Sequence, residues 1–109
     1  MNSIQGFPFF RGATEAGESD VFMSHVYTDG TIEIKGSATS FEVEIQACID
    51  RETEENWITL SVVDESDFSI KSTIEEAGLY SFNAMGKAIR VKINSISGGD
   101  LTAVGKFLN

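Results

Sequence analysis

Strict alternation of apolar and polar side chains over residues Phe41–Ile49 constrains the fold more than any other feature. Side chains of a β-strand point to opposite faces in turn, so this stretch predicts a strand with one face in a core and one in water. The apolar face carries Phe41, Val43, Ile45, Ala47 and Ile49, and the polar face carries Glu42, Glu44, Gln46 and Cys48. The stretch Ala88–Ile96 alternates in the same way and predicts a second strand.

Shorter apolar runs recur along the rest of the chain, separated by turn residues. Asp29-Gly30 predicts a tight type I′ hairpin turn, Glu75–Gly78 a further turn, and Gly98-Gly99-Asp100 a final hairpin. The remaining predicted strands are Val21–Tyr27, Thr31–Lys35, Ile58–Val62, Phe68–Ile74, Leu79–Ala84 and Leu101–Phe107, with an edge strand at Phe7–Gly12. About eight strands at this spacing predict an all-β fold, a single antiparallel two-sheet sandwich of jelly-roll-like type.

The chain shows no amphipathic helix of the kind that a parallel α/β fold requires. Only Asp50–Asn56 has a helix-like composition, and its charge favours a solvated loop. A length of 109 residues suits one domain. We therefore expect residues 1–12 to form an N-terminal arm or edge strand and residues 13–109 to form one β-sandwich domain.

Charge and targeting features limit the classes of partner. The formal net charge is −9, and the eight basic residues are scattered, which argues against nucleic acid and anionic membranes as partners. One cysteine excludes an intrachain disulfide and fits a reducing compartment. Residues Met1–Gln5 lack the pattern of a signal peptide, and no apolar run is long enough to span a membrane, so we expect a soluble protein made inside a cell.

Residues that could support catalysis or bind a metal are few. His25 and Cys48 are the only histidine and the only cysteine, and carboxylates beside Cys48 would disfavour its thiolate. The acidic stretch Asp50–Glu55 and the group Asp64, Glu65 and Asp67 are best explained as solvated turns, since neither has the glycine of a calcium loop. Seventeen acidic residues always offer carboxylate pairs, but a domain of this size can hardly build a deep cleft. We expect no enzyme activity, no cofactor and no metal.

The stretch Phe7–Phe10 holds three phenylalanines in four positions. Such side chains either pack as an edge strand on the domain's own core or dock on a neighbouring subunit, and we favour docking. The run Val21–Tyr27 is apolar on both faces, which indicates a sheet that is covered on both sides. The predicted subunit interface consists of Phe7, Phe9, Phe10, Val21, Met23, His25 and Tyr27.

An alternative interpretation assigns three of the aromatic residues to carbohydrate binding. Trp57, Tyr27 and Tyr80 would then form a stacking platform for sugar rings, as in carbohydrate-binding β-sandwiches or adhesins. The competing explanation places Trp57 and Phe82 in the core. The sequence favours the core explanation, because single aromatics at strand spacing usually face inward.

A pattern that spans Phe41–Phe107 is carried by Trp57-Ile58-Thr59-Leu60, Gly78-Leu79-Tyr80-Ser81-Phe82-Asn83, Gly86-Lys87-Ala88-Ile89-Arg90-Val91, Ile96-Ser97-Gly98-Gly99 and Leu101-Thr102-Ala103-Val104-Gly105-Lys106-Phe107. This pattern resembles small β-sandwich structural proteins of tailed bacteriophages and prophages.

The resemblance implies a non-enzymatic virion component, such as a capsid decoration, tail or fibre-associated protein, made in the cytoplasm of a bacterial host. Its expected partners are copies of itself in a homo-oligomer and other virion proteins, with a host-surface glycan as the partner in the alternative interpretation.

Overall fold

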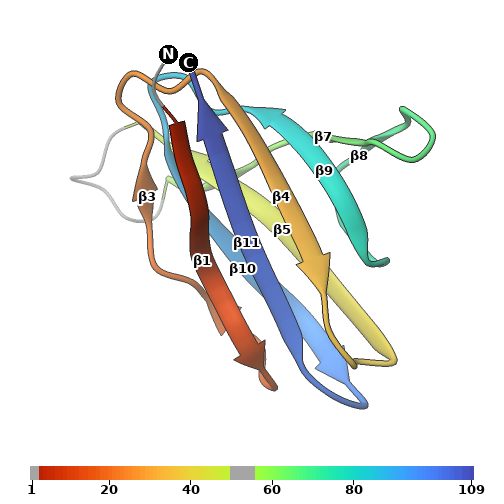
Figure 1. The fold of residues 1–109 in the computed structure, drawn as a ribbon. Helices are drawn as coiled ribbons and strands as arrows, with labels where there is room; N and C mark the ends of the chain where they lie inside the picture. Colours follow the sequence, from red (N-terminus) through yellow and green to blue (C-terminus); the bar gives the residue numbers. More distant parts are fainter. Residues whose placement is uncertain (1–2, 50–55) are drawn as a thin grey trace.

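The computed structural model describes residues 3–49 and 56–109, and these form a sandwich of two antiparallel β-sheets (Figure 1). The predicted all-β, two-sheet fold is confirmed. The described strands are β1 (Ser3–Ala13), β2 (Gly17–Glu18), β3 (Phe22–Met23), β4 (Asp29–Lys35), β5 (Ser40–Cys48), β6 (Ile58–Thr59), β7 (Val62–Asp64), β8 (Ile70–Lys71), β9 (Gly78–Asn83), β10 (Ala88–Ser97) and β11 (Leu101–Leu108).

The chain crosses repeatedly between the two sheets, so that successive strands often belong to different sheets. One sheet has the order β1-β11-β4-β9-β7-β8, and the other has the order β2-β10-β5-β6, with β3 also paired to β10. The connections from β4 to β5, from β9 to β10 and from β10 to β11 therefore all cross from one sheet to the other. Residues distant in sequence are paired as a result, and the C-terminal strand lies between β1 and β4.

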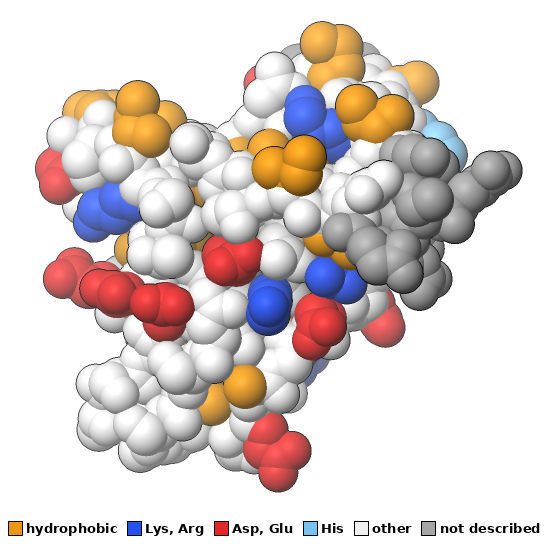
Figure 2. Space-filling view, turned by 180° about the vertical axis from the view of Figure 1, so that it is seen from behind, with side chains coloured by type: hydrophobic (Ala, Val, Ile, Leu, Met, Phe, Trp, Pro, Cys, Tyr) orange, Lys and Arg blue, Asp and Glu red, His pale blue; other side chains and the backbone are white. Residues whose placement is uncertain are grey.

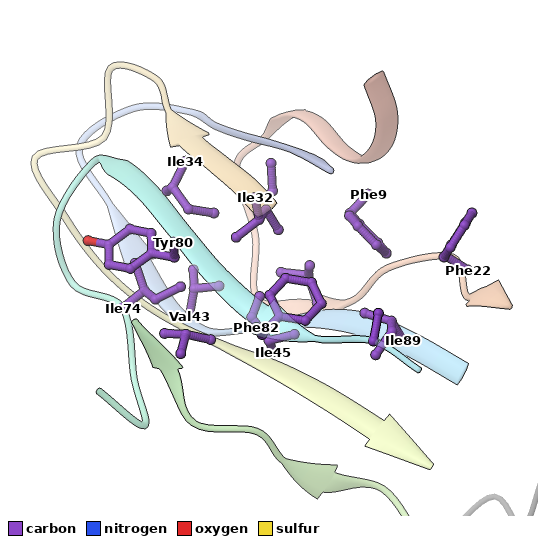
Figure 3. Packing of buried hydrophobic residues seen from close by; sticks show 14 of the residues in the cluster. Phe9, Phe22, Ile32, Ile34, Val43, Ile45, Ile74, Tyr80, Phe82 and Ile89 are labelled. Carbon is purple, nitrogen blue, oxygen red and sulfur yellow. The ribbon is translucent and has the colours of Figure 1, made fainter. Parts of the chain in front are cut away.

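The predicted alternation of β5 and β10 builds the centre of the second sheet. The two strands are antiparallel neighbours, with Val91 opposite Ile45 and Lys92 opposite Glu44. Ile45 and Val91 are at most 1% exposed and face the other sheet, which contributes Ile32 among others (Figure 3). The inward rows of the two sheets interdigitate to form one core, as in aligned β-sandwiches.

A cluster of phenylalanine rings joins the two sheets at one end of this core. The Phe107 ring from β11 stacks on the Phe22 ring from β3, with centroids 3.9 Å apart and planes at 15°. Gly30 lies between Phe82 and Phe107 on the neighbouring strands, and both rings fill the space above its missing side chain. Glycine is required here because of this close approach of two rings.

The structure contradicts the predicted hairpin around Asp29-Gly30. Both residues belong to strand β4, and the predicted strand Val21–Tyr27 is reduced to Phe22–Met23, which pairs with β10 in the other sheet. A tight turn at residues 24–27 follows, in which Tyr27 N donates to Ser24 O. Local turn propensity was outweighed by the pairing of Gly30 with Phe107 and Phe82.

The predicted final hairpin at Gly98-Gly99-Asp100 is also wrong, because β10 and β11 lie in different sheets. This turn connects the two sheets, and hydrogen bonds link it to the β4–β5 connection. The Asp100 Oδ1 atom accepts hydrogen bonds from Ser37 N and Ser37 Oγ, both at 2.9 Å. These bonds hold the pKa of Asp100 below its usual range.

The segment Phe68–Ile74 was predicted as one strand but has two separate parts. Only Ile70–Lys71 pairs with β7, whereas Ile74 forms an isolated bridge to Val43 of the other sheet. The predicted loop Asp50–Asn56 lies, except for Asn56, outside the described residues.

Replacing Gly30 tests the packing of the phenylalanine cluster. A Cβ atom at this position would lie 2.6 Å from Phe82 Cε2 and 3.1 Å from Phe107 Cε1. We expect Gly30→Ala to lower the free energy of unfolding by about 1–3 kcal/mol, as is typical of overpacking. Urea denaturation measures the change, with Thr31→Ala on the outer face of β4 as the control. An unchanged urea midpoint for Gly30→Ala would show that the Phe82 and Phe107 rings can move aside at no cost, and would contradict tight packing at this position.

Candidate functional site

The phenylalanine-rich N-terminal segment packs on the chain's own core. Phe9 is 5% exposed, and the Phe7 ring lies 4.8 Å from the Phe9 ring and 5.0 Å from the Phe22 ring, centroid to centroid. Phe10 is half-buried and packs against the same core. The structure thus supports the edge-strand alternative for Phe7–Phe10, and the preferred alternative, docking on a neighbouring subunit, stays a prediction.

The other predicted interface residues are divided between core and surface. Val21 is half-buried, and the half-buried Tyr27 ring lies 6.0 Å from the Phe22 ring, centroid to centroid. Met23 is 42% exposed, and His25 is exposed in the turn with a positive φ of 46°. Of the seven predicted interface residues, only Met23 and His25 are therefore exposed.

The three aromatic residues proposed for sugar stacking are not brought together. Tyr80 is 1% exposed, and its hydroxyl donates to Glu76 O at 2.7 Å. Burial raises the pKa of this tyrosine. Trp57 is half-buried on the outer face of the β5–β10 sheet, where the Arg90 guanidinium lies 4.2 Å from its ring centroid. The core interpretation holds for Phe82, which is 8% exposed, and not for Trp57.

Polar side chains beside Trp57 form a connected network on the same outer face. Gln46 accepts from Arg90 Nε at 2.7 Å and donates to Glu44 Oε1 at 2.6 Å. Thr59 and Asn94 also donate to the Glu44 carboxylate. Burial opposes ionisation of Glu44, but the bonds from Asn94, Thr59 and Gln46 outweigh it and lower the pKa. The polar side chains of this network therefore bond to one another, as expected on the solvent-facing side of a sheet.

Cys48 is buried, although its position in the alternation predicted a polar environment. It is 5% exposed and lines an apolar pocket together with Trp57, whereas His25 is exposed in a separate turn. Within residues 3–49 and 56–109, no group of three His, Cys, Asp or Glu side chains could hold a metal ion. This part of the chain also contains no helix that is long and apolar enough to cross a membrane.

The β7–β8 hairpin projects from one side of the sandwich (Figure 1). It carries two exposed apolar side chains. Phe68 is 79% exposed and Ile70 is 74% exposed. The turn closes through Asp64 N donating to Ser69 O and Phe68 N donating to Asp64 O. Figure 2 shows the hydrophobic group of this hairpin at the upper left, beside charged side chains.

Two aspartates fix the conformation of this turn. Asp64 Oδ1 accepts from Ser66 N and Ser66 Oγ, and its Oδ2 accepts from Lys71 Nζ at 2.9 Å. Asp67 Oδ1 accepts from both the N and the Oγ atoms of Ser69. The bond from Lys71, followed by those from Ser66, lowers the pKa of Asp64 from 3.8 to about 2. The turn is therefore held by charge-assisted hydrogen bonds and not by apolar packing.

An apolar pocket of about 520 Å³ lies beside residues 57–60, which come just before β7 in the chain. It is lined by side chains at the ends of β5 and β6, including Cys48, Trp57, Ile58 and Leu60, and by Lys87. Ile58 is 68% exposed at its rim. The sequence analysis did not predict this pocket, because its walls come from segments that pair only in the folded sheet.

A family model named XepA matches residues 3–107. The chain belongs to the XepA family. Among solved structures, it is similar to the SPBc2 prophage-derived protein YomS, with a TM-score of 0.89 and 25% sequence identity over 99% of this chain and 94% of that chain. No curated protein sequence matches the chain.

A second similar structure is that of the PBSX exported protein XepA, with a TM-score of 0.89 and 21% identity. The match covers 97% of this chain but 37% of XepA, so the chain spans little more than a third of that protein. At this identity the likeness shows a shared fold. The family and the similarity to YomS support a phage or prophage protein, as the sequence resemblance implied.

The site residue that sequence reasoning missed is Phe68, which was assigned to a strand. The acidic and serine-rich residues before it did indicate a turn. Nothing in the pattern showed that the aromatic residue itself would occupy the turn, since its positive φ becomes visible only in the structure.

The Asp64 carboxylate gives the stability of this hairpin a predictable dependence on pH. Its pKa is depressed in the folded state, so its stabilising effect is present above about pH 4 and is lost as the pH falls towards about 2. We expect the wild type to exceed Asp64→Asn in urea midpoint at neutral pH, with the difference closing over this range. The control is Glu65→Gln, which removes the charge of an exposed residue in the same turn. A pH-independent difference would contradict this role for Asp64.

Proposed function

We propose that this chain is a non-enzymatic structural protein of a phage or prophage, which works by assembly with copies of itself and with neighbouring phage proteins. Membership of the XepA family and the similarity to a prophage-derived protein support the phage context. Location in the virion is part of the proposal. XepA is an exported protein, so release from the host is the competing location.

The observation that carries the proposal is the set of apolar side chains that the fold holds in solvent. Phe68 and Ile70 are more than 70% exposed in a hairpin with an ordered hydrogen-bond network, and an apolar pocket opens elsewhere on the surface. Exposed apolar surface of this kind in a small soluble domain commonly marks an interaction site.

The glycan-binding alternative receives no support from the geometry. A stacking platform requires exposed rings in one plane, but Tyr80 is buried and Tyr27 packs on Phe22. Trp57 alone lies on an outer face, and its ring is covered on one side by Arg90.

Sedimentation velocity over a range of micromolar concentrations tests assembly. We expect a species larger than one chain whose population rises with concentration, because the exposed apolar side chains become buried between copies. A single monomeric species at high micromolar concentration would contradict self-assembly.

Fractionation tests the location independently. After induction of the host that carries the gene, mass spectrometry of purified particles and of the particle-free medium measures where the protein is found. We expect the protein in the particles. Recovery from the medium alone would exclude the virion location and favour export.

A further inference from the structure

The β7–β8 turn places an aromatic residue where its geometry calls for glycine or asparagine. Phe68 has a φ of +60°, in the left-handed region, and closes the loop between Asp64 and Ser69. Hairpin loops of this length normally have glycine or asparagine at the left-handed position, because a larger side chain is strained there. A phenylalanine at such a position is a conformational outlier, and outliers of this kind concentrate at functional sites.

The surrounding hydrogen bonds hold Phe68 in this conformation. Phe68 N donates to Asp64 O at 2.7 Å, while the Asp64 and Asp67 carboxylates bind the serines that follow them. Lys71 ties Asp64 to strand β8. The backbone at Phe68 is therefore fixed, so it loses little further freedom when a partner buries the phenyl ring.

The ring has no core role of its own. Phe68 is 79% exposed, whereas the phenylalanines at positions 9, 22, 82 and 107 are at most 8% exposed. Ile70, on the same hairpin, is 74% exposed. A strained and exposed aromatic side chain beside an exposed isoleucine forms an apolar knob on an otherwise polar turn.

The same chain offers a pocket whose chemistry fits this knob. The pocket of about 520 Å³ is lined mainly by apolar side chains, with Trp57, Ile58 and Leu60 among them. Its volume lies in the range of pockets that accept small organic groups. Lys87 is its one charged residue among those described, and it would face the acidic flank of the knob, where Asp67 precedes Phe68.

Knob and pocket lie on different sides of the molecule, so they do not meet within one chain. Figure 1 places the β7–β8 hairpin at the right and the end of β5, which lines the pocket, at the upper left. In Figure 2, which is seen from behind, the hairpin's hydrophobic group lies at the upper left. A contact between two different patches of identical chains is heterologous and continues into a ring or a filament.

We infer that Phe68 of one copy inserts into the pocket formed by Trp57, Ile58, Leu60 and Lys87 of a second copy. The inference rests on the proposed function, since it names the surface through which the chain assembles. It identifies the strained turn as the specific contact and the end of β5 and β6 as its receptor.

The test uses a variant that removes the knob without disturbing the turn. Phe68→Asn retains a residue suited to the left-handed conformation, so we expect an equal or higher thermal unfolding midpoint together with loss of assembly in sedimentation velocity. Ile58→Arg fills the pocket mouth and should also give monomers. As a matched control, Leu79→Asn removes another exposed apolar side chain, and assembly should persist.

Mixing the two defective variants distinguishes this contact from others. Phe68→Asn chains retain the pocket and Ile58→Arg chains retain the knob, so the mixture should form a complex of two chains that grows no further. A photoreactive benzoylphenylalanine at position 68 should crosslink to the peptide that contains Trp57–Leu60, whereas the same group at position 79 should not.

The outcomes separate the inference from the function on which it rests. A monomeric wild type overturns both. An assembled wild type whose Phe68→Asn variant still assembles, or whose crosslinks fall outside the pocket, overturns the knob-and-pocket contact and leaves assembly intact. Loss of assembly in both variants with recovery of a two-chain complex on mixing supports the inference.

Discussion

The stacking of Phe22 on Phe107 is the contact on which the two-sheet arrangement depends. Phe107 comes from β11, which lies between β1 and β4 in one sheet, and Phe22 comes from β3 at the margin of the other, so their rings join the layers directly. Phe9 and Phe82 pack edge-on to Phe107, and glycines 30 and 105 leave the space that these rings occupy. The C-terminal strand is thus a central structural element, and the chain closes its core only when β11 is in place.

Local patterning predicted individual strands well and their partners poorly. The alternation within β5 and β10 depends on neighbouring residues alone, and the structure has both strands as expected. Pairing depends on contacts between distant segments, so Gly98-Gly99-Asp100 was interpreted as a hairpin although it connects two sheets. In the same way, Asp29-Gly30 has the composition of a turn, but cross-strand packing of two phenylalanines on Gly30 keeps it extended.

Local patterning also failed to predict which apolar residues of the candidate site are exposed. Apolar content alone suggested that Phe7–Phe10 was surplus to a small core, yet a sandwich of this length uses these rings to fill the end of its core. Phe68 was predicted to lie in a strand, although it lies in a turn and is exposed. Composition counts apolar residues but does not reveal which of them the backbone turns outward, and that distinction separates core from contact surface.

The exposed knob and the folded core are coupled through Asp64. This residue ends β7, lies opposite the buried Tyr80 in the sheet, and is itself 6% exposed. Its backbone and carboxylate bind Phe68, Ser66 and Lys71, so the conformation of the turn is fixed from within the sandwich. Presentation of the phenyl ring therefore depends on an ionised carboxylate at the margin of the core, and protonation of that carboxylate would weaken the turn before it disturbed the apolar packing.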